Sequence, residues 1–267
     1  MSASAGRTLP DETIAAIADE LADAESRRAT VPLLTARHAG MTVDDAYAVQ
    51  GEWRRRAVAY GRRLVGHKIG LTSKVMQAAT GIDEPDYGAI LSDMVYDSGA
   101  EIEHGRFSNV RIEVELAFVL SSDVGPGATV DDVLAATAHV VPALEILSSR
   151  IELAGRTIVD TISDNAAMGA MVVGGVRRPP GELDLPWAAA VLRRNGTIEE
   201  SGVAAAVLGH PALGVAWLAD KLARHGDRLT AGEIVLAGSF TRPIWVQPGD
   251  TVMADYRDLG TITCRFV

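Results

Sequence analysis

The chain has 267 residues, a formal net charge of -10 and a hydrophobic content of 48%. This composition supports a sizeable core and excludes a disordered protein, while the acidic balance argues against a nucleic-acid or anionic-membrane partner. The single cysteine, Cys264, excludes a disulfide framework and a thiolate zinc site. Neither a secretory signal nor a membrane-length apolar stretch is visible, so we expect a cytoplasmic protein.

Two helices are predicted near the N-terminus. The first runs from Pro10 to about Ser26, with acidic residues in its first turn, where the helix dipole favours them. The second is capped by Thr42 and runs to about Tyr60. Five arginines on and after this helix are interpreted as a solvated surface rather than a binding patch: Arg54, Arg55, Arg56, Arg62 and Arg63.

Beyond Val65 glycines multiply and short strands dominate. Helices are predicted over 129–138 and 211–225, and Asn195-Gly196 is typical of a hairpin turn. Strands are predicted over 187–193, 235–240, 251–255 and 260–267. The order of elements predicts an α+β fold, with a helical N-terminal part (1–64) and a β-rich core (65–267) that form one continuous functional unit.

The stretch 111–120 alternates apolar and charged residues and predicts a strand. Because alternate side chains of a strand share a face, Glu113 and Glu115 lie side by side. Two carboxylates this close repel each other unless a cation lies between them, and a hard divalent cation would bind such oxygens. The alternative is an exposed strand face with two solvated glutamates.

A third carboxylate, Glu145, ends the almost wholly apolar stretch 139–147. A buried lone carboxylate is costly unless it is paired or binds a metal. It either reaches water, pairs with Arg150, or completes a three-carboxylate metal site with Glu113 and Glu115. We hypothesise the metal site, with positions left open for a substrate.

Two further residues are candidates for proton transfer. Lys68 lies between Gly66 and Gly70, and glycine permits close approach of a ligand to the backbone. The lysine is either a base with a lowered pKa, a cation for a carboxylate, or an ordinary strand residue. Asp86, in a polar stretch over 82–88 that we interpret as a loop, is either a general acid–base group or part of a turn.

Several segments together resemble a known group of enzymes. They are Gly66–Ser73, Ile82–Gly88, Arg111–Leu116, Pro142–Glu145, Asp160–Asn165, Gly238–Pro243, Pro248–Asp250 and Gly260–Phe266. In this order they resemble the 2-keto-4-pentenoate hydratase and 4-oxalocrotonate decarboxylase group of the fumarylacetoacetate hydrolase superfamily. The resemblance covers nearly the whole chain.

This resemblance implies a mixed β-sandwich or roll core and Mg2+ or Mn2+ held by Glu113, Glu115 and Glu145. It also implies proton transfer by Lys68 and Asp86 and a homo-oligomer, a pentamer or decamer, with a possible association with a pathway decarboxylase. Candidate substrate contacts are Leu71, Ser239 and Arg242. We expect Arg242 to bind the distal carboxylate of a diacid substrate.

The function implied is a metal-dependent hydratase that adds water to a 2-oxo acid from aromatic meta-cleavage catabolism. Three segments are most similar to enzymes that act on 2-oxo-hept-4-ene-1,7-dioate: Asp83–Tyr87, Ser163–Asn165 and Ser239–Pro243. The alternatives are a 2-keto-4-pentenoate hydratase, a 4-oxalocrotonate-type decarboxylase, and a non-catalytic partner subunit with the same fold.

Overall fold

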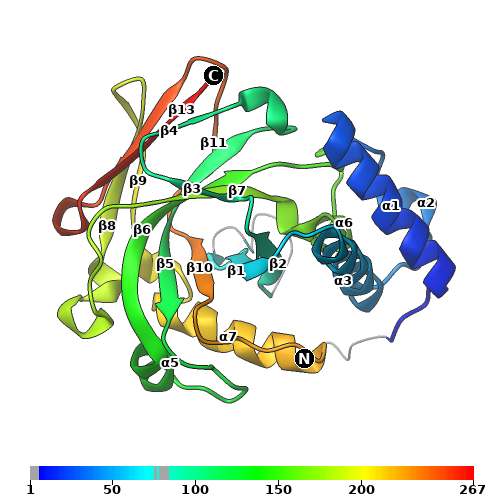
Figure 1. Cartoon of the computed structure of the whole chain (residues 1–267), viewed down its shortest axis with the longest axis horizontal. Coiled ribbons are helices and arrows are strands. Elements are labelled where there is room, and N and C mark those ends of the chain that lie inside the picture. The colour runs from blue at the N-terminus through cyan, green and yellow to red at the C-terminus, as the bar shows by residue number, and fades with distance from the viewer. Residues whose placement is uncertain (1–5, 75–76, 78–83) are drawn as a thin grey trace.

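The computed structural model describes residues 6–74, 77 and 84–267. Both predicted N-terminal helices are present, as α1 (Asp11–Arg27) and α3 (Val43–Ala59), with the short α2 (Leu34–Arg37) between them. They pack side by side on one flank of the molecule (Figure 1). The apolar stripe of α1 is buried, as its helical spacing predicts: Ile14, Ile17, Ala18 and Leu21.

Two aspartates attach the N-terminal segment to the rest of the chain. Asp45 forms a capping box with Thr42 at the start of α3 and also accepts hydrogen bonds from the backbone of Thr8 and Leu9, each at 2.9 Å. Asp160, in α6 (Ile158–Ser163), caps its own helix and accepts from the backbone and hydroxyl of Thr35. Both capping boxes can be read from the sequence, but the bonds from Thr8, Leu9 and Thr35 depend on tertiary structure.

The strands of the described residues form two sheets. The larger sheet has the order β2-β1-β10-β5-β6-β7-β3, with β11 also pairing with β5; the smaller has the order β4-β13-β12-β8-β9. The strands of the larger sheet are β1 (Leu64–Gly70), β2 (Asp86–Leu91), β3 (Val95–Asp97), β5 (Arg111–Leu120), β6 (Thr137–Leu147), β7 (Met168–Val173), β10 (Ile234–Ser239) and β11 (Ile244–Trp245). Those of the smaller are β4 (Ala100–Ile102), β8 (Ala189–Arg194), β9 (Thr197–Val203), β12 (Thr251–Asp255) and β13 (Thr261–Phe266).

Strands β5 and β6 form the centre of the larger sheet and are buried along most of their length. The Tyr256 side chain, which follows β12 of the smaller sheet, reaches this centre. Its hydroxyl lies 2.7 Å from the carbonyl oxygen of Glu115 and 2.6 Å from that of Ala143. The two sheets are therefore joined directly behind the acidic stretch of β5.

The remaining helices cover one end of the larger sheet. They are α5 (Val130–Ala136) and α7 (Pro211–Arg224), which lie together below β5 and β10 in Figure 1. A Cβ atom on Gly214 would lie 2.7 Å from the carbonyl oxygen of Ala237, so the glycine allows α7 to pack closely against β10.

Short 3-10 turns occupy His104–Arg106, Asn165–Ala167, Pro180–Glu182, Leu185–Trp187, Ala204–Ala206 and Arg257–Leu259. None of the helices in the described part of the chain is long and apolar enough to cross a membrane.

The structure confirms the α+β class and corrects three of the predicted boundaries. The strand predicted from Trp187 begins at Ala189, because Pro186 places Trp187 in a 3-10 turn. The helix predicted over 129–138 ends at Ala136, since β6 already begins at Thr137. The predicted loop over 82–88 becomes β2 from Asp86 onward, while residues 82 and 83 lie outside the described residues.

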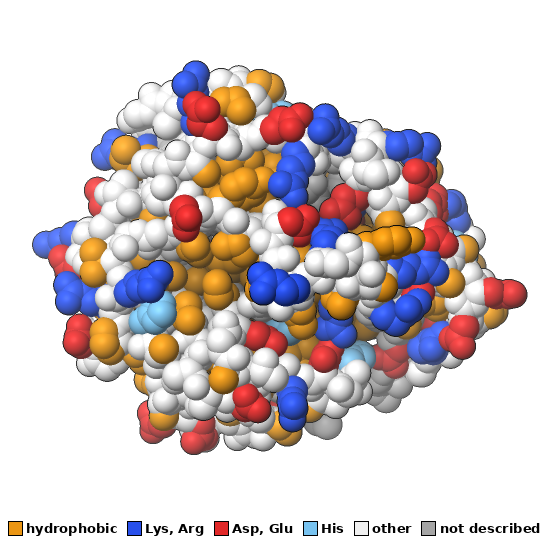
Figure 2. All heavy atoms as spheres, in the orientation of Figure 1, with side chains coloured by type: hydrophobic (Ala, Val, Ile, Leu, Met, Phe, Trp, Pro, Cys, Tyr) orange, Lys and Arg blue, Asp and Glu red, His pale blue; other side chains and the backbone are white. Residues whose placement is uncertain are grey.

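The arginines around α3 form surface ion pairs, in agreement with their interpretation as a solvated surface. Arg54 pairs with Asp227 at 2.5 Å, and Arg55 with Glu52 at 2.6 Å. Arg62 pairs with Asp93 at 2.9 Å. Figure 2 shows the same mixing of acidic and basic side chains across the visible face.

Candidate active site

The three predicted carboxylates converge on adjacent strands. Glu113 of β5 is directly opposite Glu145 of β6, and Glu115 lies two residues further along β5 on the same face. One carboxylate oxygen from each of the three lies within 4.8 Å of the other two. The sequence placed Glu113 and Glu115 together by strand periodicity, whereas the arrival of Glu145 depends on the register between the two strands.

Glu115 and Glu145 are buried and Glu113 is half-buried, and two of their oxygens lack a hydrogen bond. Glu115 Oε1 and Glu145 Oε1 have no hydrogen-bond partner among the described residues, although the other oxygen of Glu115 accepts from the backbone N–H of Gly238 at 3.0 Å. Burial, with the charge of Glu145 beside it, raises the pKa of Glu113 to about 8. Burial and the neighbouring glutamates also raise the pKa of Glu115. Three adjacent acids, two of which have a buried oxygen without a hydrogen bond, fit a hard divalent cation, which would neutralise their repulsion.

Lys68 faces the carboxylates from β1. Its Nζ lies 3.4 Å from Glu145 Oε1. Burial disfavours the charge on Lys68, but the carboxylates of Glu145 and Asp86 and those of the other two glutamates outweigh it and raise the lysine pKa. Of the interpretations left open by the sequence, the geometry therefore favours a cation beside carboxylates. The alternative pair of Glu145 with Arg150 does not form; Arg150 instead binds Asp164, at 2.5 Å.

Asp86 lies beside Lys68 because β2 pairs with β1, with Gly70 directly opposite Asp86. A Cβ atom on Gly70 would lie 2.2 Å from Asp86 Oδ1 and 3.0 Å from Lys68 Nζ. Both polar groups therefore occupy the space that a side chain at position 70 would fill. Burial raises the pKa of Asp86, although the charges of Lys68 and Arg156 oppose this. Neither carboxylate oxygen of Asp86 has a hydrogen-bond partner among the described residues.

Two cavities open onto this cluster. One, of about 300 Å³, is lined by Lys68, Asp86 and Glu113 and also by Arg111 and Arg156. The other, of about 230 Å³, contains the remaining predicted contacts, Leu71, Ser239 and Arg242. Leu71 and Glu113 line both cavities, so the two spaces adjoin.

Two of the predicted substrate contacts already have polar partners within the protein. Ser239 lies opposite Glu115 in the β10–β5 ladder, but its hydroxyl donates to the carbonyl oxygen of Thr241 at 2.8 Å. The side chain of Arg242 is 77% exposed and lies 2.7 Å from a carboxylate oxygen of Glu200. Sequence reasoning missed Arg156, which lies in the connection between β6 and α6 and carries no motif of its own.

Backbone conformation around the site is unusual. Leu71 adopts a left-handed conformation with φ 56°, and so do Asn165, Ala166 and Ala167 in succession, with φ of 49°, 51° and 58°. Non-glycine residues in this region store strain, which is held here by surrounding contacts. The Asn165 side chain accepts from the backbone N–H of Ala89 at 2.7 Å and donates to its carbonyl at 2.9 Å.

A protein-family model matches most of the chain. The model described as fumarylacetoacetate (FAA) hydrolase C-terminal matches residues 58–267, which include all the predicted site residues. The chain belongs to the fumarylacetoacetate hydrolase family.

Relatives within the fumarylacetoacetate hydrolase family have different named substrates. The chain is 52% identical to a 2-oxo-hept-4-ene-1,7-dioate hydratase of Escherichia coli, over 94% of this chain and 97% of that protein. It is 40% identical to a 2-keto-4-pentenoate hydratase of Paraburkholderia xenovorans (strain LB400), over 85% of this chain and 84% of that protein. A solved 4-oxalocrotonate decarboxylase from Pseudomonas putida G7, complexed with magnesium and adipate, has a TM-score of 0.95 and 35% identity, covering 98% of this chain and 100% of that one.

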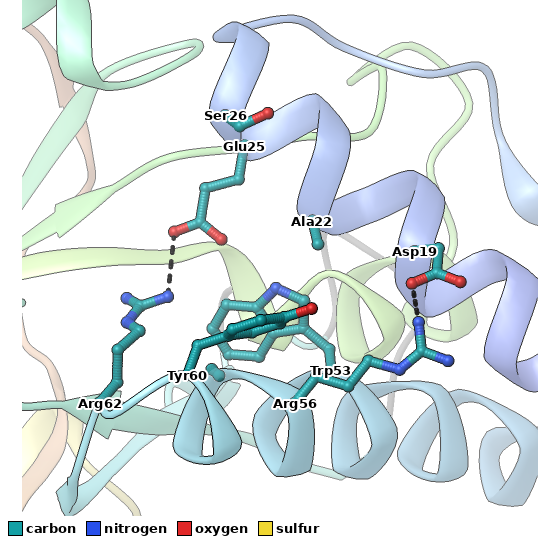
Figure 3. Close-up of a pocket in the computed structure, with 9 residues that line it drawn as sticks. Asp19, Ala22, Glu25, Ser26, Trp53, Arg56, Tyr60 and Arg62 are labelled. Atoms are coloured by element: carbon teal, nitrogen blue, oxygen red, sulfur yellow. Dashed lines mark ion pairs between the residues drawn. The ribbon is translucent and has the colours of Figure 1, made fainter.

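A further cavity, of about 690 Å³, lies between α1 and α3 and is lined by none of the candidate site residues. Figure 3 shows Trp53 and Tyr60 in its wall, with ion pairs on either side. Arg62 pairs with Glu25 at 3.5 Å, and Arg56 pairs with Asp19. Its cations are already paired, and none of the candidate catalytic residues lines it.

Proposed function

We propose that the protein is a divalent-metal-dependent hydratase of aromatic meta-cleavage catabolism. Its proposed reaction converts 2-oxo-hept-4-ene-1,7-dioate and water to 4-hydroxy-2-oxoheptane-1,7-dioate. The observation that carries this proposal is the convergence of Glu113, Glu115 and Glu145 beside Lys68, at a cavity that Lys68, Asp86 and Glu113 line. The 52% identity to a hydratase named for this substrate supports the choice of reaction.

In this proposal Glu113, Glu115 and Glu145 hold Mg2+ or Mn2+, hard cations that prefer oxygen ligands. When bound, the ion supplies Lewis acidity toward the 2-oxo group, which makes the C3 protons of the substrate easier to remove. The three glutamates must be deprotonated to bind it. Magnesium in the solved decarboxylase supports this choice of ion.

Lys68 and Asp86 are proposed to move the protons. Lys68 or Asp86 accepts a C3 proton, which leaves a dienolate, and delivers a proton to C5 to give the conjugated enone. Water then adds at C4, and a proton returns to C3. A raised pKa keeps Asp86 protonated at higher pH than an ordinary aspartate, so it has a proton to donate. The neighbouring Lys68 ammonium stabilises negative charge that develops on the substrate. The backbone at Leu71, the hydroxyl of Ser239 and the guanidinium of Arg242 are proposed substrate contacts from the adjoining cavity.

The test is a substrate assay with the purified protein and Mg2+. Loss of dienol and enone absorbance without release of CO2 is expected, with the hydroxylated product identified by mass. Release of CO2 from 4-oxalocrotonate would instead assign the second candidate, a decarboxylase, which the TM-score of 0.95 to such an enzyme favours. Failure to convert any 2-oxo acid would leave the third candidate, a non-catalytic partner subunit.

We further propose a cytoplasmic homo-oligomer, a pentamer or decamer, able to associate with a decarboxylase of the same pathway. Exposed large apolar side chains support assembly: Tyr60 is 89% exposed, Trp187 73% and Ile198 56%. Light scattering after size-exclusion chromatography measures the subunit number. A monomer at micromolar concentration would contradict the proposal.

A further inference from the structure

Arg156 lines the cavity that contains Lys68, Asp86 and Glu113, and its guanidinium is only partly hydrogen-bonded. Its side chain is only 9% exposed. Nε donates to the hydroxyl of Thr161 at 3.0 Å, and Nη1 donates to the hydroxyl of Ser149. Nη2 is buried without a hydrogen-bond partner among the described residues. Two nitrogens thus hold the guanidinium in place, while the third has only a long ion pair, with Asp164.

The nearest acid does not satisfy Arg156. Asp164 lies 3.5 Å from Nη2, beyond a good hydrogen bond. Its carboxylate already accepts from Arg150, at 2.5 Å from Nε and 2.9 Å from the backbone N–H. Because a buried charge without full pairing is costly, a bound anion would stabilise the Arg156 guanidinium.

A second cation faces the same cavity. Arg111 lies two residues before Glu113 on the same face of β5, which places it about 7 Å along the strand from that acid. Its guanidinium lies over the ring of Trp245, 5.4 Å from the centroid, and its buried Nε has no hydrogen-bond partner in the described chain. Because Arg111 and Arg156 line the same cavity, an anion bound there would meet two guanidinium groups.

The wall of this cavity has a reactive part and an apolar part in addition to the two arginines. Glu113, Lys68 and Asp86 form the reactive part of the wall, while Leu147, Leu153 and Pro243 supply apolar surface. A ligand matching all three environments carries a metal-chelating 2-oxo acid group, a short carbon chain and a second carboxylate.

We propose that Arg156, with Arg111 beside it, determines specificity for dicarboxylic substrates by binding the carboxylate distal to the 2-oxo group. The inference rests on the proposed function for the identity of the substrate class. In it, the guanidinium of Arg156, which lines the cavity, donates to the distal carboxylate. Arg242, our candidate from the sequence, is a weaker competitor because it is largely exposed and already paired with Glu200.

The test uses two ligands that cannot be hydrated and differ only in the distal group, 2-oxoadipate and 2-oxohexanoate. Their affinities are measured by calorimetry on the full-length protein with Mg2+. The wild type is expected to bind the diacid at least tenfold more tightly. Arg156→Met should reduce this preference to less than threefold. Arg265→Met, which removes an exposed arginine of β13 outside both site cavities, is the matched control and should retain it.

Four outcomes would overturn the inference. They are a wild type without preference for the diacid, an Arg156→Met variant that keeps it, a variant that loses both ligands equally, and loss of the preference in Arg242→Ala alone. If the Met variant does not fold, Arg156→Lys replaces it. The lysine retains the charge but lacks the planar guanidinium, so the preference should fall at least threefold, and an unchanged preference would refute donation by the guanidinium.

The calorimetry and the substrate assay together separate this inference from the proposed hydratase. An Arg156-dependent preference for 2-oxoadipate without hydration of any dienoate would support the anion site and refute the proposed reaction. Hydration without an Arg156-dependent preference would support the reaction and refute the anion site.

Discussion

Glu113 and Glu145 are a directly opposed residue pair of the β5–β6 ladder. Like charges at opposed positions of an antiparallel pair destabilise the sheet. Glu115 adds a third acid on the same face. Among the described residues, Lys68 Nζ is the only basic nitrogen within 4 Å of any of these three carboxylates. The central ladder of the larger sheet therefore gains stability from a cation at the site.

Replacement of Glu145 by Gln should lower the affinity for Mg2+ and Mn2+ by more than about tenfold, the lower end of the range seen when even an outer partner of a metal site is lost. The change removes a charged ligand but little volume, so the fold should persist. Calorimetric titration with Mn2+ measures the affinity. Glu152→Gln, an exposed acid outside the site, is the control. Equal affinities in wild type and Glu145→Gln would remove Glu145 from the ligand set.

Lys68→Met should reduce turnover by roughly a hundredfold or more, the scale of a general acid–base group. Metal affinity should survive, because the three carboxylates remain. Lys221→Met is the matched control, since this lysine is also buried but lies on α7 and lines neither site cavity. Loss of metal binding together with turnover would show instead that Lys68 holds the carboxylates in place.

Gly70→Ala should abolish most turnover without removing the metal ligands. The new methyl group would lie 2.2 Å from Asp86 Oδ1, so the aspartate must move away from Lys68. Gly51→Ala, in α3, meets nothing within 4 Å and should be neutral or slightly stabilising. Steady-state rates and Mn2+ titrations of both variants make the comparison. Full activity in Gly70→Ala would mean that the position of Asp86 is not critical.

Asp45→Asn should destabilise the protein near neutral pH by about 1–3 kcal/mol, because it weakens several buried hydrogen bonds. Bonds from Leu9, Thr42 and Thr8 lower the pKa of Asp45 to about 2 despite the opposing effect of burial. A lowered acid pKa stabilises the fold above the ordinary value of 3.8, and this contribution is lost as pH falls toward 2. The difference between wild type and variant should therefore shrink over that range in urea unfolding experiments.

The control for this prediction is Asp132→Asn, at the equivalent position of the α5 capping box. Asp132 makes the same bonds to Thr129, but they are exposed and no distant segment is attached. Asp132→Asn should therefore lower the free energy of unfolding by less than Asp45→Asn does. A constant difference between wild type and Asp45→Asn from pH 7 to pH 2 would contradict the assigned role of the Asp45 charge.

Local patterns in the sequence determined much of this protein. Helical spacing determined the buried face of α1, and Thr42 with Asp45 specified the start of α3. Strand alternation placed Glu113 and Glu115 on one face of β5. These features depend on interactions between residues a few positions apart, and the motif order added the family, the metal ligands and the reaction type as a resemblance.

Tertiary structure decided which distant residues meet. Strand register brought Glu145 opposite Glu113, and the β1–β2 pairing turned a predicted loop into a strand that carries Asp86 to Lys68. The connection after β6 brought Arg156 into the same cavity, while Arg242 was placed in an exposed ion pair. No periodicity encodes these meetings, because they depend on which strands pair, in what register, and on which charges are left without partners once the sheets have packed.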